Sequence, residues 1–117
     1  MMLKTIADLV SQARQQLRVI DASSAKTELN ENHGLLIDIR EISENEKSPV
    51  NGAIHIPRGI LEPTMLAKYH DAELPIYLHC ASGARATFAA EQLEKLGYQN
   101  VTVISCKSDA VISTFAS

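Results

Sequence analysis

Three short apolar runs constrain the fold of this chain more than any other feature. They cover residues 35–39, 76–79 and 101–104, and segments of helical composition lie between them. Only Asp38 interrupts the first run, which is the pattern of a strand buried on both faces in a parallel sheet. Alternating strands and helices predict an α/β fold with right-handed βα units.

The intervening segments predict the helices. Apolar side chains recur at offsets of three and four over residues 6–17, which indicates an amphipathic helix at the domain edge. Ser23 or Ser24 is expected to cap a short helix that stops at residues 32–34. Two further helices are expected: one over 61–70, with Pro63 in its first turn, and one over 86–96, which is rich in helix formers and ends at Gly97.

The remaining segments are less regular. Residues 53–56 are expected to form a short strand, while residues 19–20 are too short to assign. The stretch 41–51 is polar and carries turn signals, so we interpret it as a connection. No element is assigned after residue 104.

Composition limits the class of protein. A chain of 117 residues with 45% apolar and 21% charged side chains is expected to form one domain over 1–117, with 1–18 as a helical extension. A net charge of −3 without a basic cluster argues against nucleic acid as a partner. No apolar run approaches the ~18 residues of a membrane span, and no secretory signal is present, so we expect a cytoplasmic protein without a membrane partner.

The cysteines and histidines argue against bridges and metals. Cys80 and Cys106 form no CxxC pair, so both are expected to be reduced thiols. The histidines at 33, 55 and 70 share no ligand spacing with each other or with the cysteines. We therefore expect no metal and no cofactor.

The residues after the second apolar run carry the chemistry. Cys80 stands at the carboxyl end of a predicted parallel strand, where ligands of such sheets bind. The loop CASGAR has only small residues before Arg85, and Gly83 permits a backbone that turns its N–H groups inward. The following helix directs its positive end to the same place, which favours a thiolate at Cys80. The alternative is a cysteine that is merely buried in the core.

This loop resembles the active loop of the single-domain rhodaneses, which begins with cysteine and carries glycine and arginine where this chain has Gly83 and Arg85. LLIDIRE, NGAIHIPRGILE and AAEQLEKLGYQNVTVI are similar to the same family, so the resemblance covers most of 19–104. It implies a five-stranded, mainly parallel sheet with helices on both faces.

The resemblance also implies a sulfurtransferase. Cys80 would be the nucleophile that receives a sulfane sulfur from thiosulfate or a persulfide, holds it as a persulfide, and passes it to cyanide or a thiol. A protein is a further candidate for donor or acceptor. The substrate cradle would consist of the loop positions that follow the nucleophile, Ala81, Ser82, Gly83, Ala84 and Arg85.

Departures from the family pattern leave alternatives open. Positions 81, 82 and 84 lack the basic side chains of rhodaneses that use thiosulfate well, so thiosulfate is expected to be a weak donor. A non-catalytic rhodanese-like binding module is one alternative. A small phosphatase or arsenate reductase is another, but four residues separate Cys80 from Arg85, whereas related dual-specificity phosphatases have five.

Five further side chains are candidates for a supporting role. Asp38 and Arg40 lie where a strand leaves the sheet, and Asp38 could anchor loop amides, while the alternative for Arg40 is an ion pair with a nearby glutamate, 41 or 44. Arg58 would add positive charge at the mouth, or else lie on the surface. His79 is a poor candidate for a base because adjacent strand side chains point to opposite faces. Cys106 is expected to be a packed or surface cysteine.

Overall fold

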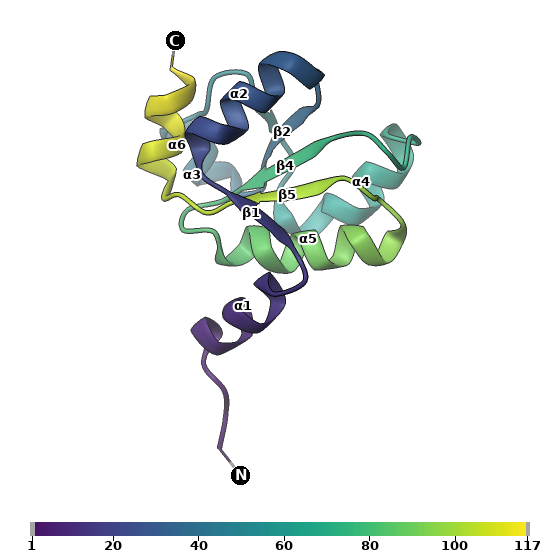
Figure 1. Ribbon diagram of the computed structural model, residues 1–117. Helices are drawn as coiled ribbons and strands as arrows, with labels where there is room; N and C mark the ends of the chain where they lie inside the picture. Colours follow the sequence, from purple (N-terminus) through teal and green to yellow (C-terminus); the bar gives the residue numbers. More distant parts are fainter. Residues whose placement is uncertain (1, 117) are drawn as a thin grey trace.

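The computed structural model describes residues 2–116, which fold around one five-stranded sheet (Figure 1). All strand pairs are parallel, and the spatial order is β1-β5-β4-β2-β3. The strands are β1 Arg18–Ile20, β2 Leu35–Asp38, β3 Ile54–His55, β4 Ile76–His79 and β5 Val101–Ile104. The helices are α1 Ile6–Arg14, α2 Ala22–Asn32, α3 Ile42–Lys47, α4 Leu61–Lys68, α5 Ala84–Leu96 and α6 Ser108–Phe115, and a 3₁₀ turn, η1, covers Arg58–Ile60.

Strand register sorts the side chains onto two faces. Ile37, Leu78 and Val103 are register partners on the face covered by α4 and α5, and all three are fully buried. Their neighbours Leu36 and Tyr77 point to the opposite face, which α2 and α6 cover. Each such aliphatic side chain contributes ~1.5–3 kcal/mol of burial free energy. The predicted α/β sheet with helices on both faces is confirmed.

Helix α1 lies outside these two layers and packs on α5 (Figure 1). It begins with a reciprocal cap in which Thr5 Oγ1 accepts from the Asp8 N–H and the Asp8 carboxylate accepts from the Thr5 N–H. Ala13 is its buried residue, whereas Ile6 is 61% exposed. The predicted helix over 6–17 is therefore shorter, because the chain leaves it after Arg14 to enter β1.

The other corrections concern short or polar elements. Asp21 caps α2 by accepting from the Ser24 N–H at 2.8 Å, so the prediction of Ser23 or Ser24 as the cap is wrong. The polar stretch interpreted as a connection contains α3, whose first turn is closed when the Glu44 carboxylate accepts from the Glu41 N–H at 2.9 Å. The unassigned tail contains α6.

The loop after β4 is shorter than expected. Helix α5 begins at Ala84, two residues before the predicted start, and Gly83 is its N-cap with φ of 95°. That left-handed conformation suits glycine because a side chain there is strained. The helix closes at Gly97, also left-handed, as predicted. The carboxyl ends of β2, β4 and β5 thus lie together beside the N-terminus of α5.

Candidate active site

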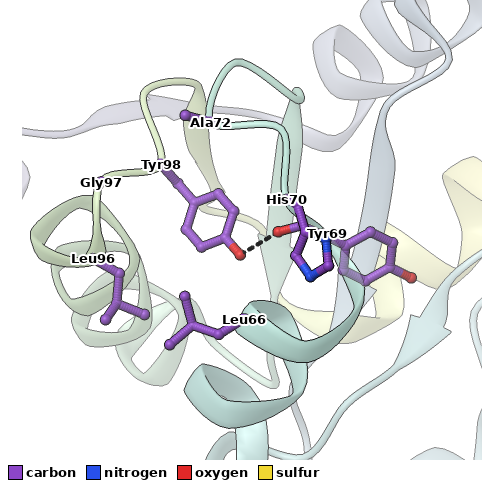
Figure 2. Close-up of a pocket in the computed structure, with 7 residues that line it drawn as sticks. All are labelled: Leu66, Tyr69, His70, Ala72, Leu96, Gly97 and Tyr98. Atoms are coloured by element: carbon purple, nitrogen blue, oxygen red, sulfur yellow. Dashed lines mark hydrogen bonds between the residues drawn. The ribbon is translucent and has the colours of Figure 1, made fainter.

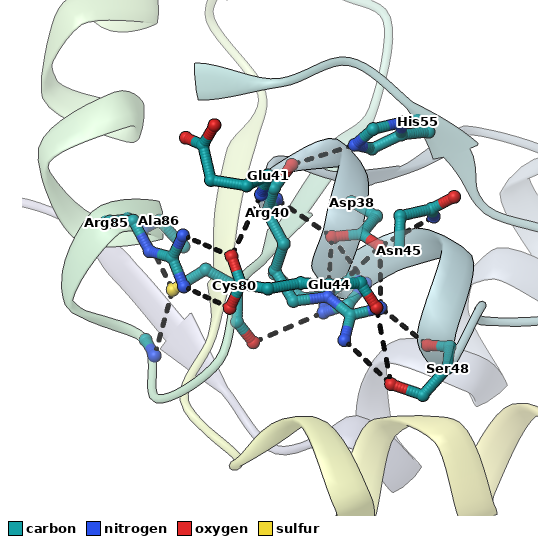
Figure 3. A network of polar contacts seen from close by, with 12 residues as sticks. Asp38, Arg40, Glu41, Glu44, Asn45, Ser48, His55, Cys80, Arg85 and Ala86 are labelled. Carbon is teal, nitrogen blue, oxygen red and sulfur yellow. Dashed lines mark hydrogen bonds and ion pairs between the residues drawn. The ribbon is translucent and has the colours of Figure 1, made fainter. Parts of the chain in front are cut away.

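Cys80 follows the central strand β4 directly, and its sulfur meets the N-terminus of α5 (Figure 3). The Sγ atom accepts hydrogen bonds from the Gly83 N–H at 3.1 Å and from the Ala86 N–H at 3.4 Å. Both donors belong to the first turn of a helix or its cap, where backbone N–H groups lack intrahelical partners. The sulfur therefore lies where the backbone and the helix dipole both favour negative charge.

The five predicted cradle residues have different positions around that sulfur. Of residues 81–85 in the described chain, only Gly83 donates its N–H to Sγ, and Ala86, one residue beyond the predicted cradle, supplies the second donor. Ala81 turns its carbonyl toward α6, where it accepts from the Ser108 N–H at 2.9 Å. Ser82 is exposed, and Ala84 and Arg85 form the first turn of α5. Ala86 was missed because the helix begins earlier than predicted.

The guanidinium of Arg85 is held by a carboxylate. It donates two hydrogen bonds to Glu44 of α3, at 2.8 and 3.0 Å, and the pair lies beside Cys80 in Figure 3. The hydrogen bonds from Arg85 lower the pKa of Glu44 to about 2, and those to Glu44 raise the pKa of Arg85. Both side chains are about one third exposed, at 35% and 34%. Glu44 was not predicted as a site residue, because the polar segment that carries it showed no helical pattern.

Asp38 and Arg40 form a buried ion pair at the end of β2, with their side chains 0% and 3% exposed. Arg40 Nη2 donates to Asp38 Oδ2 at 2.8 Å and to the Ser48 carbonyl at 2.7 Å, and Asn45 donates to the same carboxylate at 3.0 Å. Burial opposes ionisation of Asp38, but the hydrogen bonds from Arg40 and Asn45 outweigh it and lower its pKa to about 2.

This network holds the turn that leads into α3, and its hydrogen bonds do not involve the Cys80 sulfur. The alternative partners expected for Arg40, Glu41 or Glu44, are wrong, since its ion-pair partner is Asp38. The hydrogen bonds that Asp38 accepts come from Arg40 and Asn45, and within residues 2–116 none comes from the loop after β4. Asp38 and Arg40 therefore lie beside Cys80 at the helix that carries Glu44, and their bonds to Asn45 and Ser48 hold that segment (Figure 3).

His79 is fully buried beside this network. Its Nε2 atom lies 3.6 Å from Asp38 Oδ1 and has no hydrogen-bond partner in the described part of the chain. Burial lowers the pKa of His79, although the Asp38 charge opposes that shift. Its ring therefore lies against the Asp38 carboxylate in the interior, and no hydrogen bond joins it to the Cys80 sulfur.

Two other candidates lie apart from the sulfur. Arg58, in η1, pairs with Glu62 at 2.7 Å, and no side-chain bond joins it to the loop in the described chain. Cys106 packs against the α2–α6 layer, and its Sγ accepts from the Ala22 N–H at 3.2 Å. It thus helps to cap α2, and both cysteines are free thiols.

A separate cavity of about 370 Å³ lies between the C-terminal ends of α4 and α5 (Figure 2). Tyr98 donates its hydroxyl to the Tyr69 carbonyl at 2.7 Å there, and Leu66 and Leu96 line the wall. Cys80 lies at the other end of α5, so this cavity is not part of the sulfur site.

Among residues 2–116 there is no group of three or more His, Cys, Asp or Glu able to hold a metal, and no helix long and apolar enough to cross a membrane.

Comparisons with known proteins identify the family. The family model described as "Rhodanese-like domain" matches residues 21–108. A Bacillus subtilis protein named "Putative sulfur carrier protein YrkF" is 35% identical over 82 residues, covering 70% of this chain and 43% of the relative. A Schizosaccharomyces pombe protein named "Putative thiosulfate sulfurtransferase, mitochondrial" is 31% identical over 78 residues, covering 57% of this chain and 55% of the relative. The chain thus spans about half the length of these relatives.

Solved structures agree on the fold. The 30 kDa polysulfide-sulfur transferase homodimer of Wolinella succinogenes superposes with a TM-score of 0.75 at 27% identity, covering 91% of this chain and 80% of that one. A rhodanese-like domain from an Anabaena protein gives a TM-score of 0.72 at 21% identity, covering 80% of this chain and 72% of that one. With three quarters of its length matched by the family model, this chain belongs to the rhodanese-like domain family.

Proposed function

We propose that this chain is a sulfurtransferase that carries a sulfane sulfur as a persulfide on Cys80. The observation that carries the proposal is the pair of backbone N–H groups, from Gly83 and Ala86, that donate to Sγ at the positive end of α5. Such N–H groups stabilise an anionic sulfur by hydrogen bonding, so no side-chain base is needed to hold the thiolate. Relatives named as a sulfur carrier and as a thiosulfate sulfurtransferase support the same chemistry.

The proposed reaction needs two displacements at sulfur. The Cys80 thiolate attacks the outer sulfur of thiosulfate, a new S–S bond forms, and the S–S bond of the donor breaks with its electron pair leaving on sulfite. Cyanide or an acceptor thiolate then attacks the terminal sulfur of the persulfide. The electron pair of the enzyme's S–S bond returns to Cys80, and thiocyanate or an acceptor persulfide departs. The cycle is redox-balanced and needs no cofactor.

The site favours donors with little negative charge. Arg85 already has a carboxylate partner, and the positions that could add a cation, 81, 82 and 84, are Ala, Ser and Ala. A dianion such as thiosulfate therefore meets mainly backbone donors. A persulfide, presented by a small thiol or by a protein, fits this site better, and thiosulfate serves as a slow assay donor. The two free thiols fit a reducing, cytoplasmic setting.

Intact-protein mass after incubation with a donor tests the proposal. Thiosulfate, inorganic polysulfide and glutathione persulfide are each added to the wild type, to Cys80→Ser and to Cys106→Ser. We expect a gain of one sulfur atom in the wild type and in Cys106→Ser, and none in Cys80→Ser. Because Cys106 contacts α2 and not the loop, its variant is a matched control for losing one thiol.

One observation favours a second function. Cys80 is only 1% exposed, so a donor reaches its sulfur only after neighbouring groups move, which suits a non-catalytic module that binds partners through its loop surface. If none of the three donors adds sulfur to the wild type, that binding role replaces the sulfurtransferase.

A further inference from the structure

The charge around the loop after β4 is nearly cancelled. Arg85 is paired with Glu44, and positions 81, 82 and 84 carry no charge. Beside the loop, Asp38 and Arg40 neutralise each other. A site that stabilises an anionic sulfur would gain from a cation that has no carboxylate partner. Such a cation lies in α1, which precedes the family match that begins at residue 21.

Arg14 lies at the C-terminal end of α1, and its guanidinium reaches the cap of α5. Its Nε atom donates to Thr87 Oγ1 at 3.1 Å, and that hydroxyl donates to the Gly83 carbonyl at 2.7 Å. Thr87 is fully buried in α5. Arg14 and the Gly83 carbonyl are thus connected through one fully buried side chain.

The same guanidinium also covers Gly83 directly. A Cβ atom at position 83 would lie only 2.6 Å from Arg14 Nη2, so the cation packs against the glycine Cα. The N–H of this residue is the one that donates to Cys80 Sγ at 3.1 Å. The guanidinium therefore packs against the same residue whose N–H donates to the sulfur.

No carboxylate neutralises this cation. Within residues 2–116, Arg14 makes no ion pair, and its side-chain hydrogen bond goes to the neutral hydroxyl of Thr87. The other charged or titratable groups around the loop are the Arg85–Glu44 and Asp38–Arg40 pairs, Glu41, whose charge acts on Arg85, the buried His79, and Lys107, which is exposed at the start of α6.

We propose that Arg14 is a positioning residue of the sulfur site, which holds Gly83 by packing against it and through Thr87, and which supplies the unpaired positive charge that the loop itself lacks. The family match begins at residue 21, so this role makes α1 part of the site although it lies outside the matched region. The inference rests on the proposed function and deepens it, since the charge would stabilise both the thiolate and the persulfide anion.

The test separates charge from structure with Arg14→Gln and Arg14→Lys. The rate of Cys80 alkylation by iodoacetamide is measured against pH in a Cys106→Ser background, and thermal unfolding checks that each variant is folded. Lys95→Gln, at the far end of α5, is the control for losing one positive charge. A persulfide-loading measurement by intact mass accompanies each variant.

We expect Arg14→Gln to move the pH–rate midpoint upward and to slow alkylation at neutral pH about threefold, as the loss of one nearby charge predicts. Arg14→Lys should recover most of the rate, and Lys95→Gln should match the wild type. An Arg14→Gln profile identical to the wild type overturns the inference, even if sulfur loading occurs. An Arg14→Lys profile as shifted as that of Arg14→Gln overturns the charge role. If the wild type takes up no sulfur but Arg14→Gln still shifts the pH–rate profile, the proposed function is overturned and the role of Arg14 stands.

Discussion

The ion pair between Arg85 and Glu44 makes the proposed preference for weakly charged sulfur donors testable. Glu44→Gln keeps the size of the side chain but removes the charge that occupies Arg85. The pair is bidentate, at 2.8 and 3.0 Å, yet both side chains are about one third exposed, at 35% and 34%, so water screens it. Exposed pairs of this kind contribute ~0.2–1 kcal/mol. The variant should lose no more than that in unfolding free energy.

The same magnitude sets the expected gain for an anionic donor. Once Glu44 is neutral, Arg85 is free to attract thiosulfate, and up to about 1 kcal/mol of attraction corresponds to a KM for thiosulfate that falls up to about fivefold. Thiocyanate formation at saturating cyanide, with thiosulfate varied, measures this change. Because the pKa of Glu44 is about 2, its carboxylate stays ionised across the neutral range, and the effect should not vary with pH there.

Glu62→Gln is the matched control for this experiment. It frees Arg58 from an ion pair of similar exposure, 27% and 31%, that has no bond to the loop. Its KM for thiosulfate should equal that of the wild type. If Glu44→Gln raises the KM for thiosulfate instead, the carboxylate serves to hold Arg85 in a binding position. The idea that Glu44 keeps Arg85 from attracting thiosulfate is then refuted.

Three other substitutions test the scaffold around the sulfur. Asp38→Ala leaves the Arg40 guanidinium buried without its partner and should cost about 3–5 kcal/mol in urea unfolding, whereas a loss typical of a surface pair would contradict the buried role. Burial lowers the pKa of His79 from 6.5, so the unfolded state binds more protons and stability should fall as pH drops below 6.5; His79→Asn should flatten that slope, and an unchanged slope would contradict it. Gly83→Ala forces a side chain into a left-handed backbone with φ of 95° and against Arg14, which should cost ~1–2 kcal/mol and reduce persulfide loading on intact mass; full loading would argue that the loop tolerates another conformation.

The strands could be predicted because their signal is local and strong. β4 and β5 have the bounds expected from their apolar runs, since buried parallel strands need continuous apolar sequence. α3 could not be predicted, because it is six residues long, buries none of them, and is stabilised by a cap between Glu44 and the Glu41 backbone. α6 is only eight residues long and follows the last strand without a recognisable capping side chain.

The contacts of the site also divide into local ones, which the sequence predicts, and long-range ones, which it does not. Cys80 and the Gly83 N–H are three residues apart, so their meeting follows from a glycine turn at the start of a helix. Arg85 and Glu44 are 41 residues apart, and Arg14 and Thr87 are 73 apart, so these contacts exist only because the sheet brings α1, α3 and α5 together. A single sequence holds no signal for such pairs of charged or polar side chains.

These long-range contacts change which part of the site controls the sulfur. If Arg85 acted as a free cation, the loop alone would explain how an anionic sulfur is stabilised. With Arg85 held by Glu44 and Arg40 held by Asp38, the remaining positive field near the sulfur comes from the Gly83 and Ala86 N–H groups, the α5 dipole and Arg14, with the exposed Lys107 at the start of α6 further out. Backbone donors recognise a single anionic sulfur by position, and they offer little to a second charge. A site built in this way should therefore discriminate between donors by the charge they carry beyond the transferred sulfur, with a protein or thiol persulfide preferred to a small dianion.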